Sequence, residues 1–369
     1  MCQQLSKLMI VNKKKLISIH LNENGGANKA SRLITEQLKN DSRVSLKEQF
    51  LEYSGDYTFF STVRIFMSKI SVISSFFLEY KSEISSVYTS SYLVAFLSVI
   101  FNKKTIFHFH GFELGEKKDF VLNANNKFTR IYLGFFYSLN VFILKYVCVK
   151  AYAILVPVSS SLQFLEQKTG LLLKQKSLVV LNGLSSSEYK SSANLFGAKK
   201  KVAFIGRIDE QKGIDHMLSV FEKWSSFSLD IFAPSVGTTY EKLIVKKVLS
   251  MPNVSIYFDK EPSEIHKKIS LCTATMLLSE SEQLPLALIE SVASSIPMIV
   301  SNSFKASKII KAVSKNLIIK SQNVVEIRSI ICNVYYMDEK SKKLLCSRMN
   351  RLSKYFSWDK SVEAIIANL

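Results

Sequence analysis

Apolar residues along this chain fall into short runs that alternate with stretches of helical spacing. The first run is KKLISIHLN at residues 14–22, and ASRLITEQL at 30–38 follows with apolar residues three and four positions apart. Short apolar runs are typical of strands, and three-to-four spacing is typical of helices. Residues 85–100 and 151–170 repeat this strand-then-helix order. The alternation predicts an α/β fold with parallel sheets.

A polar, serine-rich stretch at 185–198 interrupts the pattern, which then restarts. Beyond it, the spacing predicts strands at 201–208, 228–234, 254–259, 273–279 and 297–301, and helices at 213–224, 239–250 and 285–295. Two such series indicate two Rossmann-like, doubly wound domains. We expect them at residues 1–190 and 191–350, with a C-terminal helix at 351–369 that packs back toward the first domain.

The net charge of the chain indicates the kind of partner that it binds. The net charge is +19, of which residues 1–200 carry +13 and residues 201–369 carry +6. A basic N-terminal half indicates an anionic partner such as a membrane surface, a phosphorylated lipid or a nucleic acid. A lysine-rich solvated surface is the alternative. The five cysteines include no CxxC pair, which favours a reducing, cytoplasmic compartment.

Residues 131–149 approach the length of a membrane span, but Asn140 and Lys145 interrupt them. A lysine at the centre of a bilayer costs about 2.5–3.5 kcal/mol, so a buried or membrane-surface helix is favoured. Basic and aromatic residues also interleave at 57–80 and 127–150. This pattern fits a surface that rests on anionic lipid. Ordinary buried helices and a nucleic-acid stacking platform are the alternatives.

The stretch GRIDEQKG at 206–213 is the first candidate for chemistry. Gly206 and Arg207 close a predicted strand, and Lys212 and Gly213 open a predicted helix. Backbone N–H groups at a helix start favour anions, and two cations across the turn would add a diphosphate clamp. The alternative is that both cations are solvated loop residues.

Two glutamates in an apolar segment are the second candidate. Glu282 follows the strand at 273–279, and Glu290 falls in the second turn of a helix that begins near Pro285. A carboxylate on an apolar helix is rarely buried without a partner, and sugar or ribose hydroxyls can donate to it. For Glu282, a favourable interaction with the helix dipole is the alternative.

Taken in order, these motifs resemble those of family-4-type retaining glycosyltransferases of the bacterial surface-polysaccharide type. The matching segments are HFHGFE, PVSSSLQFL, VVLNGL, GRIDEQKG, EQLPLALIE, SIPMIVS and YFSWDKSVEAI. The resemblance implies the GT-B fold, in which two Rossmann-like domains face one another across a cleft. Two departures are Gln283-Leu284-Pro285 where the family usually has Gly-Phe-Gly, and Ser294-Ser295 where it has Cys-Gly.

The resemblance also implies roles for individual residues. Catalysis is assigned to His110, near the transferred sugar, and to Glu282, on the sugar hydroxyls. The donor-binding residues are Gly25, Gly26, Gly206, Arg207, Lys212, Leu286 and Glu290, with the two cations on the diphosphate and Glu290 on the ribose. His108 and His110 share one side of a strand, but two histidines alone are a weak metal site. The chain contains no Asp-x-Asp pair, so no metal and no other cofactor is expected.

The function implied is transfer of a sugar, with retention, from a nucleotide-diphosphate donor (an EC 2.4 enzyme). Its expected partners are a polyprenyl-diphosphate-linked saccharide acceptor of O-antigen or capsule synthesis and an anionic membrane surface. We expect a cytoplasmic protein, peripheral at the inner face of the plasma membrane, with no nucleic-acid partner. The alternatives are an inverting transferase, a sugar-nucleotide epimerase and, less favoured, a basic nucleic-acid-binding protein.

Overall fold

A computed structural model describes most of the chain. The residues it describes are 14–21, 26–51, 61–80, 82, 84–111, 127–184, 199–279, 282–302, 307–321 and 323–368. They form two compact units, Met1–Val180 with Trp358–Leu369, and Leu181–Ser357. Within the expected C-terminal segment 351–369, the unit boundary falls between Ser357 and Trp358.

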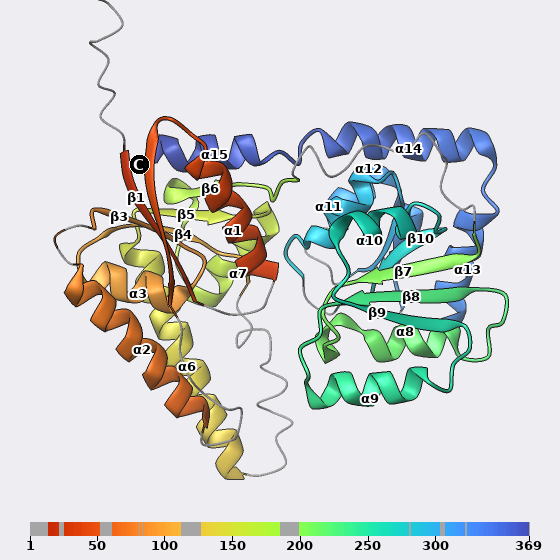
Figure 1. The fold of residues 1–369 in the computed structure, drawn as a ribbon, viewed down its shortest axis with the longest axis horizontal. Helices are drawn as coiled ribbons and strands as arrows, with labels where there is room; N and C mark the ends of the chain where they lie inside the picture. Colours follow the sequence, from red (N-terminus) through yellow and green to blue (C-terminus); the bar gives the residue numbers. More distant parts are fainter. Residues whose placement is uncertain are drawn as a thin grey trace, which may run out of the picture. The chain divides into compact units, whose positions relative to one another are not determined.

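In the part of the chain that the structure describes, the first unit contains a six-stranded parallel sheet in the order β2-β1-β3-β4-β5-β6 (Figure 1). Its strands are β1 (Lys14–Leu21), β2 (Val44–Leu51), β3 (Ser86–Thr89), β4 (Lys104–His108), β5 (Ala153–Val156) and β6 (Ser177–Val179). Its helices are α1 (Gly26–Lys39), α2 (Ser61–Glu79), α3 (Tyr92–Ile100), α6 (Lys127–Lys150), α7 (Ser159–Thr169) and α15 (Trp358–Ala367). The 3-10 turn η2 (Lys174–Lys176) precedes β6.

Strands β3 and β5 are buried at every position. Burial on both sides explains why β5, with the sequence AILV, is a continuous apolar run. Strand β2 is different, because VSLKEQFL lies at the edge of the sheet and is buried only at its two ends. Its pattern of polar and apolar residues therefore predicted no strand.

The C-terminal helix α15 packs on α1 in the first unit. Arg43, in the turn before β2, donates through both terminal nitrogens to Glu363 of α15, at 2.6 and 3.1 Å. The same guanidinium donates to Asp41 at 2.7 Å. These contacts are exposed to solvent, so apolar packing by buried residues such as Ile365 and Ile366 contributes most of the docking energy.

The second unit contains the other six-stranded parallel sheet of the described residues, in the order β12-β11-β10-β7-β8-β9. Its strands are β7 (Lys201–Ile205), β8 (Ser228–Ala233), β9 (Val254–Phe258), β10 (Ala274–Leu277), β11 (Met298–Ser301) and β12 (Ile318–Ile319). Its helices are α8 (Ile214–Phe221), α9 (Thr239–Val248), α10 (Pro262–Ile269), α11 (Leu286–Ala293), α12 (Ser307–Val313), α13 (Val324–Tyr335) and α14 (Glu339–Ser353). The 3-10 turns are η3 (Glu210–Lys212) and η4 (Lys315–Leu317). The α/β prediction with parallel sheets is confirmed.

No helix among the described residues is both long and apolar enough to cross a membrane. Helix α6, which contains residues 131–149, instead packs against α3 and α7.

Ser295, which stands where the family has glycine, adopts a left-handed conformation with φ of 57° between α11 and β11. Its hydroxyl donates to Asn350 Oδ1 of α14 at 2.7 Å. The left-handed turn is therefore kept without glycine, and a hydrogen bond offsets part of the strain that a Cβ introduces there.

We expect Ser295→Gly to be more stable than Ser295→Ala by about 1 kcal/mol. Both variants lose the hydroxyl, so their difference isolates the cost of a Cβ at positive φ. Urea unfolding of the two proteins measures it. Equal midpoints would show that this turn is not strained.

Candidate functional site

The strand order of the second unit indicates where a ligand is expected to bind. Numbered within the unit, the order is 3-2-1-4-5-6, and its switch point lies between β7 and β10. These two strands pair in parallel, with Ala203 opposite Thr275. The loops that follow them, which carry Gly206–Lys212 and Ser279–Glu282, therefore leave the same edge of the sheet at the place where Rossmann-like domains bind nucleotides.

The loop after β7 is held by its own backbone. Gly206 has φ of 154°, its N–H donates to the Phe232 carbonyl at 3.0 Å, and a Cβ on it would lie 3.1 Å from the Phe204 ring. Asp209 then accepts from the Gln211 N–H at 3.0 Å and so caps η3. This cap fixes the turn from which Lys212 projects.

Gly213 connects the two loops of the site. Its φ is 69°, and a Cβ on it would lie 2.6 Å from the Leu278 carbonyl oxygen. A glycine is thus required both by the backbone conformation and by the contact with the chain that leaves β10. The close approach brings the start of α8 against the segment that leads to Glu282.

At this junction the structure brings together two predicted site residues, Lys212 and Glu282, as an ion pair. The side chains are 21% and 13% exposed, so solvent and ligands can reach both. Ser279 donates to the same Glu282 oxygen at 3.4 Å, and Ser301 at the end of β11 donates to the Ser279 carbonyl at 2.6 Å. The sequence predicted a diphosphate role for the lysine and a sugar role for the glutamate, but it did not predict their contact.

A residue that sequence reasoning did not assign to the site also supports this loop. Asn182 is 3% exposed, and its side-chain amide donates to the Leu284 carbonyl at 2.9 Å. That bond fixes the segment between Glu282 and α11. The signal in the sequence was the segment VVLNGL, which resembles the glycosyltransferase family but gave Asn182 no role.

Helix α11 follows with Pro285 at its N-cap position, at φ of −69° and ψ of 145°. Proline suits this place because a helix start leaves its first N–H groups unbonded anyway. The first helical residue is Leu286, and half-buried Glu290 lies one turn later on a helix whose Leu288 and Ile289 are fully buried. Glu290 is therefore on the less buried side of α11, as expected for a ligand-binding carboxylate.

In the first unit the order 2-1-3-4-5-6 places the switch point between β1 and β3. Gly25 lies outside the described residues, and Gly26 is the first residue of α1, directly after this point. His110 lies two residues beyond β4, beside the switch-point strands. Gly26 and His110 are thus close to the carboxyl edge of the sheet in this unit.

His110 lies against His108, with ring centroids 4.0 Å apart, which confirms that the two share one side of the chain. His108 Nδ1 lies 2.8 Å from the Tyr88 hydroxyl, which holds that ring in place. Burial lowers the pKa of His110 to about 4, and burial followed by the nearby His110 lowers the pKa of His108. Both rings are therefore neutral at pH 7. Among the described residues, buried His110 Nε2 has no hydrogen-bond partner.

His20, near the end of β1, forms a second buried cluster. Its Nε2 lies 2.9 Å from Ser18 Oγ and 3.5 Å from Glu48 Oε1. Burial has the largest effect on the pKa of His20 and lowers it. The Glu48 carboxylate raises this pKa, whereas the positive charges of Arg32 and Lys39 lower it, and the resulting value is about 4. His20 is thus also neutral in the folded protein at pH 7.

These shifts predict that the first unit loses stability as the pH falls from about 6.5 to about 4. The unfolded chain binds a proton at each histidine near pH 6.5, whereas the folded chain binds it only near pH 4. The stabilisation is complete above pH 6.5 and is lost below it. Thermal unfolding between pH 7.5 and 4.5 measures the effect, and His20→Gln should flatten the acid side of the profile. A flat wild-type profile would contradict the assignment.

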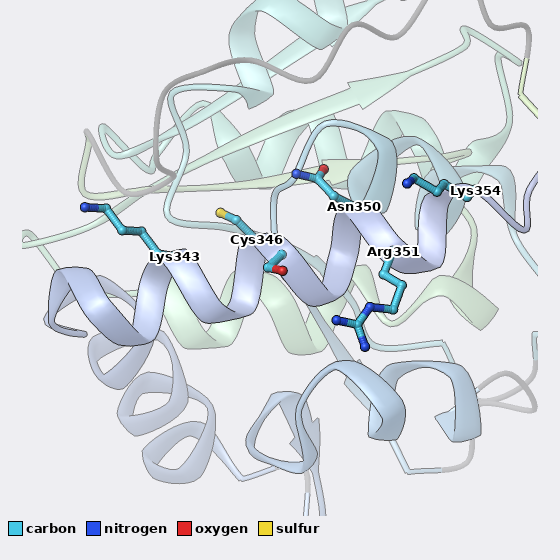
Figure 2. A pocket seen from close by; sticks show the side chains of 6 residues that line it. Lys343, Cys346, Asn350, Arg351 and Lys354 are labelled. Atoms are coloured by element: carbon cyan, nitrogen blue, oxygen red, sulfur yellow. The ribbon is translucent and has the colours of Figure 1, made fainter.

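A pocket on α14 is lined by residues that do not belong to the loops described above (Figure 2). Cys346 and Asn350 project from the same side of the helix. The pocket is lined by Lys343, Cys346, Ser347, Asn350, Arg351 and Lys354, none of which was predicted as a site residue. Among the described residues, no group of three or more His, Cys, Asp or Glu side chains could hold a metal ion. The candidate site therefore remains the one built on β7 and β10.

Solved structures of glycosyltransferases resemble the chain over nearly its whole length. Anabaena HepE, crystallised with UDP and glucose, gives a TM-score of 0.72 at 12% identity, covering 96% of this chain and 98% of that one. Sucrose-phosphate synthase from Thermosynechococcus elongatus gives 0.74 at 14%, covering 96% and 97%. The lipopolysaccharide outer core galactosyltransferase WaaB gives 0.60 at 14%, covering 97% and 100%. At these identities the likeness shows the fold, which is GT-B.

Comparison with curated protein sequences finds no match. A family model does match, and it is described as "Glycosyl transferases group 1". It covers residues 185–344, which span most of the second unit and include the loops after β7 and β10. The second unit therefore carries a glycosyl transferases group 1 domain, and the chain is an enzyme of the glycosyltransferase class.

Proposed function

We propose that this protein is a family-4-type enzyme that transfers a sugar from a nucleoside-diphosphate donor, with retention, to a polyprenyl-diphosphate-linked saccharide. The single observation that carries the proposal is the ion pair of Lys212 and Glu282 at the switch point of a glycosyl transferases group 1 domain. A cation for the diphosphate and an acceptor for sugar hydroxyls lie side by side there.

The chemistry follows from which charges develop in the reaction. Cleavage of the anomeric C–O bond leaves negative charge on the departing phosphate and oxocarbenium character on the sugar. Preorganised cations aimed at that phosphate are a strong source of rate acceleration. A lysine ammonium has three N–H donors, so Lys212 can keep Glu282 and still donate to phosphate oxygens. Arg207, beside Gly206 in the same loop, is the second cation, and this pair makes a metal unnecessary.

The two glutamates divide the donor between them. Glu282 accepts from the sugar hydroxyls, and Glu290, one turn into α11, accepts from the ribose hydroxyls. The N–H of Leu286 is in the unbonded first turn of α11, where helix starts favour anions. Asn182 holds the segment between Glu282 and α11 through Leu284, so it is a positioning residue for the donor.

His110 serves the transferred sugar. Its neutral ring and its buried, unpartnered Nε2 among the described residues make it suited to one hydrogen bond with a sugar hydroxyl. Without that bond, a buried polar nitrogen is costly. The proposal assigns no general base, because in a same-face reaction the leaving phosphate helps to remove the acceptor proton.

The positive charge of the first half of the chain supports a lipid-linked acceptor. The basic first half of the chain matches an anionic lipid diphosphate at the inner face of the plasma membrane. Such acceptors are used in O-antigen and capsule synthesis, and WaaB, one of the structural neighbours, is a lipopolysaccharide outer core galactosyltransferase. Together these features support a peripheral enzyme of surface-polysaccharide assembly.

A donor screen tests the proposal. Released nucleoside diphosphate is measured for a panel of nucleotide sugars with lipid-linked acceptors, starting with UDP-glucose because HepE has been crystallised with it. One donor is expected to turn over with the wild type, and Glu282→Ala is expected to abolish release. Failure of every donor with every lipid-linked acceptor would contradict the proposal.

Stereochemistry is tested separately. Proton NMR of the new glycosidic linkage is expected to show the anomeric configuration of the donor. The opposite configuration would identify an inverting transferase, and an epimerised donor without transfer would identify a sugar-nucleotide epimerase.

A further inference from the structure

We infer that the outer side of α6 rests on the surface of an anionic phospholipid bilayer. The inference deepens the proposed function, because it names the surface that meets the phase in which a lipid-linked acceptor is dissolved. Four exposed apolar side chains of α6 and the positive charge of this helix support it.

Among the side chains of α6 that the structure describes, four large apolar ones are exposed, namely Ile131, Phe135, Phe142 and Val149, which we call the α6 stripe. Their exposed fractions are 63%, 64%, 62% and 49%. They are separated by four, seven and seven positions, so they lie within about 40° of one another around a helix with 3.6 residues per turn. The stripe is about 27 Å long at 1.5 Å per residue.

The core of the first unit does not need these residues. The opposite side of α6 supplies Ile143, Leu144 and Val147, which are buried against α3 and the sheet. The ring of Phe136 meets Phe66 of α2 edge-on with centroids 6.0 Å apart, and α2 and α6 continue together past the sheet (Figure 1). The rotation of α6 is thus set by its inner side, and this leaves the stripe turned outward.

Charge determines which partner suits the stripe. Helix α6 contains four Lys or Arg residues and no Asp or Glu. Exposed Lys145 lies three positions after Phe142 and four before Val149, so it is on the same side as the stripe. At a bilayer, its stem can lie along the apolar surface while the ammonium reaches anionic headgroups.

A second copy of the chain fits less well. Packing two stripes together would bring two Lys145 side chains close to the same contact and oppose two chains of net charge +19. An exposed apolar side on a helix whose charged residues are all basic is the pattern of helices that lie in the membrane interface. The helix is not apolar enough to cross, which agrees with a position on the surface.

Flotation with vesicles tests the inference. The full-length protein is expected to bind phosphatidylcholine vesicles that contain phosphatidylglycerol, and to bind pure phosphatidylcholine vesicles weakly. Phe135→Ser and Phe142→Ser combined should weaken binding at least about tenfold, since two phenyl rings no longer leave water. Lys145→Glu should weaken binding to the anionic vesicles only.

The matched control combines Leu243→Ser and Leu249→Ser, which remove two leucines of the second unit that are 60% and 84% exposed. It should bind as the wild type does. Equal binding by the stripe variant would show that general positive charge is sufficient and would overturn the inference. So would a dimer in light scattering that the stripe variant dissociates while vesicle binding stays the same.

Turnover separates this inference from the proposed function. The stripe variant should release nucleoside diphosphate at the wild-type rate with a detergent-dispersed acceptor, because none of its changes is in the donor site. Stripe-dependent vesicle binding without any turnover would support the inference and count against the proposed function.

Discussion

Replacing Lys212 by alanine is expected to lower kcat by about 10²–10³-fold while changing the donor KM much less. Lys212 is the cation that the structure places beside Glu282 at the carboxyl edge of the second sheet, next to its switch point. If it stabilises charge that appears on the phosphate only as the anomeric bond breaks, its loss affects the transition state more than the bound donor. Steady-state kinetics with the donor found in the screen measure both constants.

The ion pair allows a second interpretation, in which Lys212 acts only by orienting Glu282. A double-mutant cycle separates the two interpretations. If Lys212 acts on the phosphate, Lys212→Ala in a Glu282→Gln background should still lower kcat by about tenfold or more. If it only orients the glutamate, the double variant should be no slower than Glu282→Gln alone. Lys242→Ala, an exposed lysine of α9, is the matched control and should leave kcat unchanged.

Much of the fold could be predicted because parallel sheets bury their strands on both sides. Continuous apolar runs such as 201–208 and 273–279 became β7 and β10, and the helices expected beside them occur within a few residues. Edge strands β2 and β12 and helices α10, α12, α13 and α14 were not predicted. Strand β2 is buried only at its ends, and α14 has few buried residues in a largely charged sequence, so neither has a clear apolar period.

The candidate site could be predicted only as separate parts. Short motifs indicated Arg207, Lys212, Glu282 and Glu290, because strand ends carry the ligands of Rossmann-like domains. That Lys212 contacts Glu282 depends on β7 pairing with β10, and a strand order is not encoded in any one motif. The role of Asn182 depends on a contact with Leu284, about a hundred positions away along the chain.

Gly213→Ala is expected to destabilise the second unit by about 3 kcal/mol or more, from backbone strain and overpacking together. At φ of 69° a side chain is strained, and its Cβ would lie 2.6 Å from the Leu278 carbonyl oxygen and 2.8 Å from the Leu278 Cβ. Neither of those atoms is the end of a flexible side chain, so the backbone after β10 has to move. Urea unfolding measures the loss.

Gly237→Ala provides the matched control, because Gly237 has φ of 74° and no heavy atom within 4 Å of its would-be Cβ. It should cost only the strain of the left-handed conformation, about 1 kcal/mol. The difference between the two variants therefore isolates the contact between the loops after β7 and β10. Because that contact sets the path toward Glu282, Gly213→Ala should also raise the donor KM, whereas Gly237→Ala should not. Equal unfolding midpoints and equal KM values would mean that the two loops are positioned independently, and that Lys212 and Glu282 are not held together by the fold.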